Sequence, residues 1–428
     1  MILKSDRAIC RPVCGQSNGK RPFQHTMSKI AEPKRTILAF AAGTWRWPQV
    51  FGSPRYHLWT LAQRGWRVVY VEPPVRLRIS SSHAAPPDAM HPAEFHVIAP
   101  GMILPFAPRM VPSRALGEWW RQLTANRMAK GAKSFLSRMG WRVDAVWYGA
   151  PWHGAIAGHF ADVASVYHVY DELAKSPALN SWQQQMLHDW EKDLMQSAHV
   201  TACSSLPQLE ARRSVARRTL LLENAIPDDF GGKVSEGSRS GALRASLSKL
   251  PRPLFLYGGV IDHRMDGALV KKLLSNERVG AVSFAGNLDR NTDNELKDLL
   301  QQHPKAHLLG RLSHEDYPVV YEQADALVLL HKRNQFTETM YPEKLNEYLS
   351  SGKPILSIPL PEVVRIASQC ELPGAVHFIH SADDMDNAIS ACVDDRDAAL
   401  SQARISVARK HTWSAMGAVL DDALRAFL

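Results

Sequence analysis

Short, continuously apolar runs recur along the chain, separated by segments long enough to form helices. In the first half these runs lie at residues 36–42, 67–71, 95–99, 145–148, 163–169, 200–203 and 219–222. Apolar and polar positions do not alternate within them, which is typical of parallel strands buried on both faces. The segments between them, such as residues 55–64 and 182–197, are long enough for crossover helices.

The same alternation restarts in the second half. Strands are predicted at residues 254–257, 281–284, 307–309, 326–330, 355–358 and 376–379. Helices are predicted at residues 266–274, 292–301, 318–323, 342–350, 385–393 and 397–410. Two successive strand–helix series predict an α/β protein with two doubly wound, Rossmann-like domains. Ligands of such sheets bind beyond the carboxyl ends of the strands, so we expect a site in a central cleft that the two domains face.

Changes in composition suggest where the domains begin and end. Residues 1–33 are polar, basic and without periodicity, so we predict a disordered extension, with Met27 as a candidate initiator. Residues 231–250 are rich in glycine and serine, which favours a flexible connection. The predicted division is therefore 34–235 for the first domain, 236–250 for a linker, 251–410 for the second domain and 411–428 for a final helix.

Overall composition is that of an ordinary soluble protein. The chain has 428 residues, of which 45% are hydrophobic and 22% charged, so global disorder is excluded. The five cysteines are widely spaced and odd in number, which argues against a disulfide framework and favours the cytoplasm. The sequence contains no apolar run of about 18 residues, so no transmembrane helix is expected.

The positive charge is concentrated in one segment. The formal net charge is +9, and residues 101–142 contain eight Lys or Arg residues and one acidic residue, Glu118, for a net +7. Trp119, Trp120 and several aliphatic residues are interspersed with them. This pattern fits either a helix on an anionic membrane leaflet or a crossover helix with a solvated basic face. No recognised nucleic-acid-binding module accompanies the charge, so no nucleic-acid partner is expected.

The segment of residues 341–359 carries the most specific chemistry. Pro342 suits a first helical turn, and Gly352 with Pro354 marks the end of the helix. Lys344 and Glu347 then share one face. A carboxylate there can accept hydrogen bonds from a ribose diol, and a lysine at a helix start can neutralise a diphosphate. By spacing alone, an exposed amphipathic helix with ordinary surface charges is the favoured interpretation.

This segment resembles the C-terminal signature of family 4 glycosyltransferases, in particular their bacterial surface-polysaccharide and teichuronic-acid-type branch. The matching residues are Pro342, Lys344, Leu345, Glu347, Tyr348 and Leu349. The resemblance implies that Glu347 binds the ribose and that Lys344 lies beside the phosphates. The family has a first glutamate eight positions before the second, where this chain has Thr339, so the donor sugar is left open.

Further matches extend the resemblance over about residues 35–428. In the second domain it implies donor contacts from Gly258 and Gly259, from Arg264 beside the diphosphate, and from the backbone of Arg311 and Leu312 beside the base.

In the first domain the resemblance implies an acceptor-side wall that includes Trp45, Arg55 and His57. Asp171, or as a second choice His168, would take the proton of the acceptor hydroxyl. A helix N-cap is the alternative role for Asp171.

The resemblance implies a GT-B glycosyltransferase that moves a sugar from a nucleotide-sugar to a saccharide or lipid-linked acceptor in surface polysaccharide biosynthesis, with retention of anomeric configuration. It would work in the cytoplasm, at the inner face of the membrane. Asp384 with Asp386, and Asp395 with Asp397, form D-x-D patterns in helix-like segments, so we expect no metal and no other cofactor. A catalytically silent nucleotide-sugar-binding subunit and a nucleotide-sugar epimerase are the alternative functions.

Overall fold

The computed structural model describes residues 34–43, 52–73, 94–99, 110–176, 178–231 and 238–427. Trp45, the extension at residues 1–33 and the start of the basic segment at residues 101–109 lie outside these ranges. Residues 34–428 belong to one compact unit.

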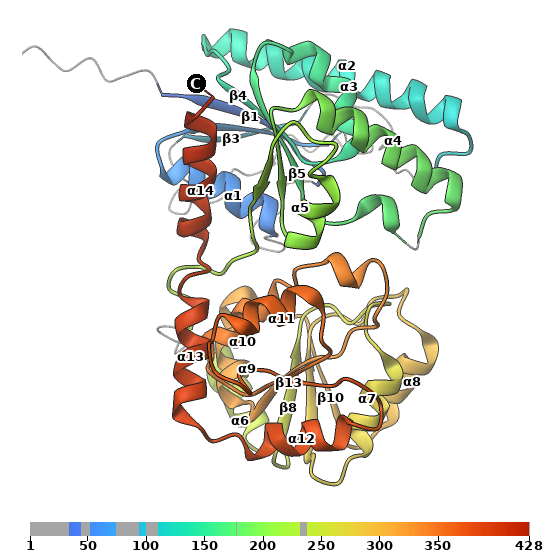
Figure 1. The fold of residues 1–428 in the computed structure, drawn as a ribbon, viewed down its shortest axis with the longest axis vertical. Helices are drawn as coiled ribbons and strands as arrows, with labels where there is room; N and C mark the ends of the chain where they lie inside the picture. The colour runs from blue at the N-terminus through green and yellow to red at the C-terminus, as the bar shows by residue number, and fades with distance from the viewer. Residues whose placement is uncertain are drawn as a thin grey trace, which may run out of the picture. The chain divides into compact units, whose positions relative to one another are not determined.

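Two parallel sheets form the framework of this unit (Figure 1). The first has the order β3-β2-β1-β4-β5-β6-β7 and the second the order β10-β9-β8-β11-β12-β13. The strands of the first are β1 (Thr36–Phe40), β2 (Arg67–Val71), β3 (Phe95–Ile98), β4 (Ala145–Tyr148), β5 (Ala164–Val169), β6 (Val200–Cys203) and β7 (Thr219–Leu221). Those of the second are β8 (Leu254–Gly258), β9 (Ala281–Ala285), β10 (Ala306–Gly310), β11 (Ala326–Leu329), β12 (Ile355–Ser357) and β13 (His377–Phe378). Each predicted apolar run overlaps one of these strands, which confirms the α/β prediction.

Helices cover both faces of each sheet. Around the first sheet they are α1 (Ser53–Gln63), α2 (Arg114–Met139), α3 (Gly154–Ala157), α4 (Ser181–Ser197) and α5 (Leu206–Arg212). The following chain forms α6 (Ser238–Leu247), α7 (Gly267–Ser275), α8 (Asn294–Gln302), α9 (Tyr317–Gln323), α10 (Lys344–Ser350), α11 (Pro361–Ser368), α12 (Met385–Asp394), α13 (Ala398–Ala408) and α14 (Trp413–Arg425). None of the helices in these ranges is both long and apolar enough to cross a bilayer.

Successive residues of a central strand enter different cores, as a strand with two buried faces requires. In β1, Ile37 and Ala39 belong to one apolar cluster, whereas Leu38 and Phe40 belong to another. In β8, Leu256 and Phe255 divide in the same way. The lack of alternation in the sequence therefore has a direct structural cause.

The predicted linker is the main difference from the expected organisation. Residues 238–247 of the stretch 236–250 are helical, because α6 buries Leu247 in the core around the second sheet. Arg244 of this helix pairs with Glu322 on α9. A glycine- and serine-rich composition therefore concealed a short helix.

The last helix belongs spatially to the first sheet. α13 packs on α10, whereas α14 packs on α1 (Figure 1). Asp421 of α14 accepts a 2.7 Å hydrogen bond from the indole of Trp66, and Gly417 leaves room for Thr60. The chain thus returns to its N-terminal half after completing the second sheet.

Candidate functional site

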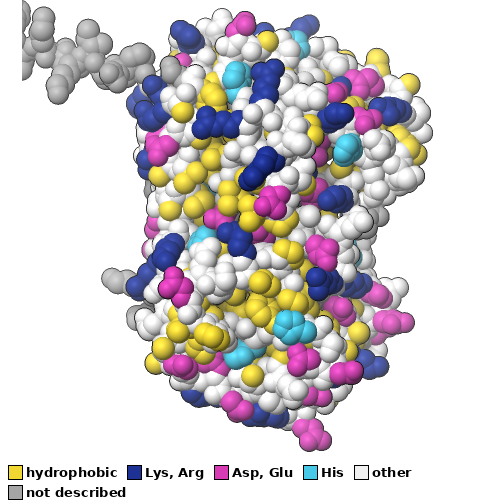
Figure 2. All heavy atoms as spheres, in the orientation of Figure 1, with side chains coloured by type: hydrophobic (Ala, Val, Ile, Leu, Met, Phe, Trp, Pro, Cys, Tyr) yellow, Lys and Arg dark blue, Asp and Glu magenta, His cyan; other side chains and the backbone are white. Residues whose placement is uncertain are grey.

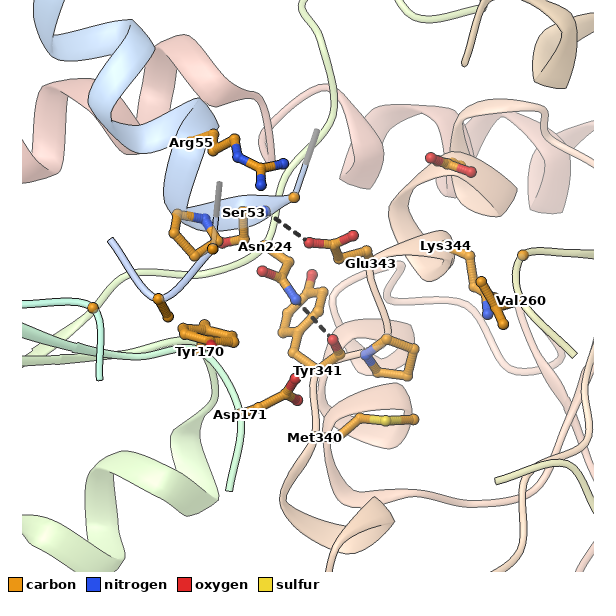
Figure 3. A pocket seen from close by; sticks show the side chains of 18 of the residues that line it. Ser53, Arg55, Tyr170, Asp171, Asn224, Val260, Met340, Tyr341, Glu343 and Lys344 are labelled. Carbon is orange, nitrogen blue, oxygen red and sulfur yellow. Dashed lines mark hydrogen bonds between the residues drawn. The ribbon is translucent and has the colours of Figure 1, made fainter. Parts of the chain in front are cut away.

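A cavity of about 530 Å³ opens beyond the carboxyl ends of strands from both sheets (Figure 3). Its first wall comes from residues 41–43 after β1, the start of α1, and Tyr170 and Asp171 after β5. Its second wall comes from residues 258–260 after β8, His331 after β11, and residues 340–344 with Glu347. The topology therefore places the cavity where doubly wound sheets bind their ligands.

Lys344 presents an ammonium group to this cavity. Its Nζ donates to the Tyr257 hydroxyl at 2.9 Å and lies 4.5 Å from the centre of the same ring. Gly259 makes this position available, because a Cβ there would lie 2.6 Å from Nζ of Lys344. The glycine also has φ +126°, which other residues rarely adopt.

Glu347 presents a carboxylate beside Lys344 in the same wall. Its Oε2 accepts a 2.6 Å hydrogen bond from the Tyr321 hydroxyl, and its Oε1 lies 3.7 Å from Nε2 of His314. Gly258 permits this arrangement, since a Cβ there would lie 2.4 Å from the Tyr321 hydroxyl oxygen. The two glycines were predicted to contact the donor, and in the structure Gly258 makes room for Tyr321, which holds Glu347, and Gly259 makes room for Lys344.

Arg264 reaches the cavity with its orientation fixed by one partner. Its guanidinium donates three hydrogen bonds to the Asp262 carboxylate, from Nε to Oδ1 at 2.9 Å and to Oδ2 at 3.0 Å, and from NH2 to Oδ2 at 2.6 Å. The guanidinium also holds the pKa of Asp262 below its usual value, although burial of that carboxyl opposes the effect. The remaining N–H groups of Arg264 can serve a ligand.

Asp171 faces the second wall from the end of β5. Burial raises the pKa of Asp171 to about 6; Arg264 opposes this rise, and Glu172 and Asp262 add to it. Its side chain is half-buried and lines the cavity, so a ligand hydroxyl can reach it. A carboxyl group that ionises near neutral pH is suited to accept a proton.

Glu343 is a cavity residue that the sequence did not single out. Its Oε1 accepts a 3.0 Å hydrogen bond from the backbone N–H of Ser53, at the start of α1 (Figure 3). The side chain is exposed within the open cavity, between residues of the two walls. This environment raises the pKa of Glu343 to about 7, first through desolvation and then through Glu347 and Asp171.

The other predicted residues of the first wall divide between the cavity and the core. Arg55 lines the cavity and contacts the hydroxyl of Tyr70, which offsets part of the rise that burial causes in the pKa of Tyr70. His57 and His168 do not line it; they are 0% and 1% exposed, with ring centroids 5.3 Å apart. Burial holds the pKa of both histidines well below the usual value. His168 is therefore badly placed to receive a proton from a ligand.

Three predicted donor-side residues also lie outside the cavity lining. Leu312 packs in the core around the second sheet, and Arg311 is exposed. Thr339 ends a short 3-10 helix, where its hydroxyl donates to the Phe336 carbonyl and its own carbonyl accepts from Ser205 at 2.6 Å. At the N-terminus of α7, the backbone N–H groups of Ala268 and Leu269 already donate to the Asp266 side chain, so these two groups do not serve a phosphate.

His331 is a second residue that the sequence analysis missed. It lines the cavity two residues beyond β11 and is 2% exposed. Its position after an apolar run was the available signal, since residues at that place in a parallel sheet face the ligand edge.

The D-x-D patterns lie away from the cavity. Asp386 accepts a hydrogen bond from Asn276, and Asp395 pairs with Arg404 and His377. Within the described ranges, no group of three or more His, Cys, Asp or Glu side chains could hold a metal ion. Metal independence stays a prediction.

Comparisons with known proteins agree on the architecture. No family model matches the chain. It is 19% identical over 284 residues to TuaH from Bacillus subtilis, provisionally named a teichuronic acid biosynthesis glycosyltransferase, covering 63% of this chain and 69% of TuaH. Sucrose-phosphate synthase from Thermosynechococcus elongatus superimposes with a TM-score of 0.69 at 16% identity, covering 92% of this chain and 99% of the synthase. Anabaena HepE in complex with UDP-glucose gives 0.64 at 15% identity, covering 91% and 99%. The chain has the GT-B fold of these structures.

Proposed function

We propose that the chain is a glycosyltransferase that transfers a sugar from a nucleotide-sugar donor to an acceptor held by the first domain. The observation that carries this proposal is the convergence of Lys344, Arg264 and Glu347 on one cavity beyond two parallel sheets. Two cations suit a diphosphate, and a carboxylate held by Tyr321 suits a ribose diol. HepE, a protein of the same fold, has been solved with UDP and with UDP-glucose, which favours a uridine nucleotide.

Each charged group then has a defined part in the reaction. Lys344 and Arg264 stabilise the negative charge that develops on the departing diphosphate, in place of a metal. Glu347 fixes the nucleotide through its ribose. Asp171 accepts the proton of the acceptor hydroxyl. Retention of anomeric configuration and membership of family 4 rest on the sequence resemblance.

The acceptor is proposed to be a saccharide or a lipid-linked saccharide in surface polysaccharide assembly. The name of TuaH, which refers to teichuronic acid, supports this setting. The reaction is then expected on the cytoplasmic side of the membrane, where a nucleotide-sugar is available.

The test is release of nucleoside diphosphate from UDP-glucose and other nucleotide-sugars, with and without added acceptor. We expect release in the wild type and its loss in Glu347→Ala. Tight binding without release would favour the silent binding subunit, for which the Thr339 substitution is the motivating observation. Conversion of the donor to an isomer without release would favour the epimerase.

The α2 helix is proposed to contact an anionic membrane leaflet. Trp119 is 58% exposed and Leu116 39% exposed near its start, and the helix has no Asp or Glu after Glu118. Elsewhere, on the face shown in Figure 2, acidic and basic side chains are interspersed. Exposed apolar residues beside exposed basic ones are suited to an anionic bilayer surface.

We expect the protein to sediment with vesicles that contain anionic lipid, and less so as salt rises. Replacement of the exposed Lys130 or Lys133 by Ala should weaken partitioning about fivefold, since each basic residue contributes about 1 kcal/mol at such a surface. Trp119→Ala should also weaken partitioning, and Val419→Ala on α14, also at an exposed apolar position, is its matched control. Equal sedimentation with neutral vesicles would contradict the proposal.

A further inference from the structure

The carboxyl group of Glu343 lies in the cavity between Lys344 and the first wall. Glu343 follows Pro342, immediately before α10, so it stands on the turn that leads into the helix. Thr339 lies four residues earlier. Its hydroxyl donates to the backbone of its own turn, and its carbonyl accepts from the Ser205 hydroxyl. Of these two side chains, only Glu343 faces the cavity.

The Glu343 carboxyl is positioned by one bond and keeps capacity for a ligand. Ser53 N–H occupies Oε1 at 3.0 Å, and an ionised carboxylate has about four acceptor positions. Figure 3 shows the Glu343 carboxyl directed from the second wall toward Ser53 and Arg55, whereas the Lys344 side chain extends from the same turn toward Val260. A donor whose diphosphate binds Lys344 and whose sugar extends toward the first wall would place that sugar beside Glu343.

The charge around this position discriminates between sugars. After desolvation, the carboxylates of Glu347 and Asp171 are what raise the pKa of Glu343, so negative charge is already crowded there. A further carboxylate would be repelled, whereas hydroxyl groups can donate to Glu343.

Building on the proposed function, we infer that Glu343 binds hydroxyl groups of the transferred sugar and restricts the donor to sugars without a carboxylate. This role assigns to Glu343 the sugar contact that Thr339 does not make. It also connects the sugar to the first domain, since the same carboxyl caps the start of α1.

The experiment compares donor pairs that differ only in oxidation at C6. Dissociation constants would be measured at pH 8 for UDP, for UDP-glucose against UDP-glucuronate, and for UDP-galactose against UDP-galacturonate. We expect the wild type to bind the neutral member of a pair at least tenfold more tightly. In Glu343→Gln, which keeps an acceptor oxygen but removes the charge, this ratio should fall toward one while UDP affinity is unchanged.

A matched control separates sugar recognition from domain bridging. Glu362 makes an equivalent bond, accepting from the backbone N–H of Leu206 at the start of α5, but does not line the cavity. Glu362→Gln should therefore leave the neutral-to-uronate ratio as in the wild type. An equal loss of discrimination in both variants would assign Glu343 a structural role only.

The pH dependence gives a second readout. The pKa of Glu343 is about 7, so discrimination should be weaker at pH 6 than at pH 8 in the wild type. Arg55 on α1, Asp171, Glu347 and Lys344 face the same region, and the smaller pH dependence that Glu343→Gln retains would report Asp171. Preference of the wild type for the uronate would overturn the inference, whereas failure of UDP itself to bind would count against the proposed function instead.

Discussion

Asp171→Asn is expected to lower kcat by about 10²–10⁴-fold while leaving the donor dissociation constant nearly unchanged. The amide keeps the size of the side chain but cannot accept the proton of the acceptor hydroxyl. Asp193→Asn, on the exposed side of α4, is the matched control. Initial rates and donor titrations of the three proteins would measure the effect, and an unchanged kcat in Asp171→Asn would place the base elsewhere.

The pH profile should identify the same group. The pKa of Asp171 is about 6, so kcat of the wild type should fall as pH drops through 6, where the carboxylate is protonated. A carboxyl whose folded pKa exceeds its unfolded value loses its contribution to stability as pH rises through the folded pKa. Asp171→Asn should therefore melt higher than the wild type at pH 8, but not at pH 3.5. Loss of activity with increased stability would exclude misfolding as the cause.

Lys344→Ala is expected to lower kcat/KM by about 10²–10³-fold, the effect of removing one preorganised group that stabilises a developing anion. The Tyr257 hydroxyl that holds the ammonium would remain but cannot supply its charge. Lys271→Ala, at an exposed position of α7, should be without effect. Steady-state kinetics over a range of donor concentrations would measure the change, and less than a threefold loss would contradict the assignment.

Gly259→Ala tests whether the position of Lys344 matters as well as its charge. The added Cβ would lie 2.6 Å from Nζ, so the ammonium must move from Tyr257. We expect a loss of the same sign as in Lys344→Ala and, in the double variant, little further loss, because the two changes act on one group. Additive losses would show that Gly259 serves the donor independently of Lys344.

The fold was predictable from sequence because both sheets are buried on two faces. Buried parallel strands such as β1 and β8 are continuously apolar, and that pattern is visible without a structure. α11 was not predicted, although it is amphipathic, because it is only eight residues long and lies between two apolar runs. The glycine and serine content around α6 outweighed its few apolar positions.

Site residues that follow the end of a strand were predictable from the sequence. Residues whose role depends on the direction of the side chain were not. Asp171 and Arg264 follow strands and reach the cavity, as their positions in the sequence indicated. His168 lies inside β5, where the alternation of side chains directs it into the core. Glu343 was missed because the helix was expected to start at Pro342, whereas α10 begins at Lys344 and leaves Glu343 on the turn.

Calorimetric titration of UDP into the wild type and Glu347→Ala tests the central claim most directly. The account predicts binding by the wild type and an affinity about 10–100-fold lower in the variant, the effect of losing hydrogen bonds to a charged group. Tyr321→Phe, which removes the hydroxyl that holds Glu347, should give a smaller loss of the same sign. Equal affinity of wild type and Glu347→Ala, or no binding of UDP or any other nucleoside diphosphate at millimolar concentration, would contradict a nucleotide-sugar site in this cavity.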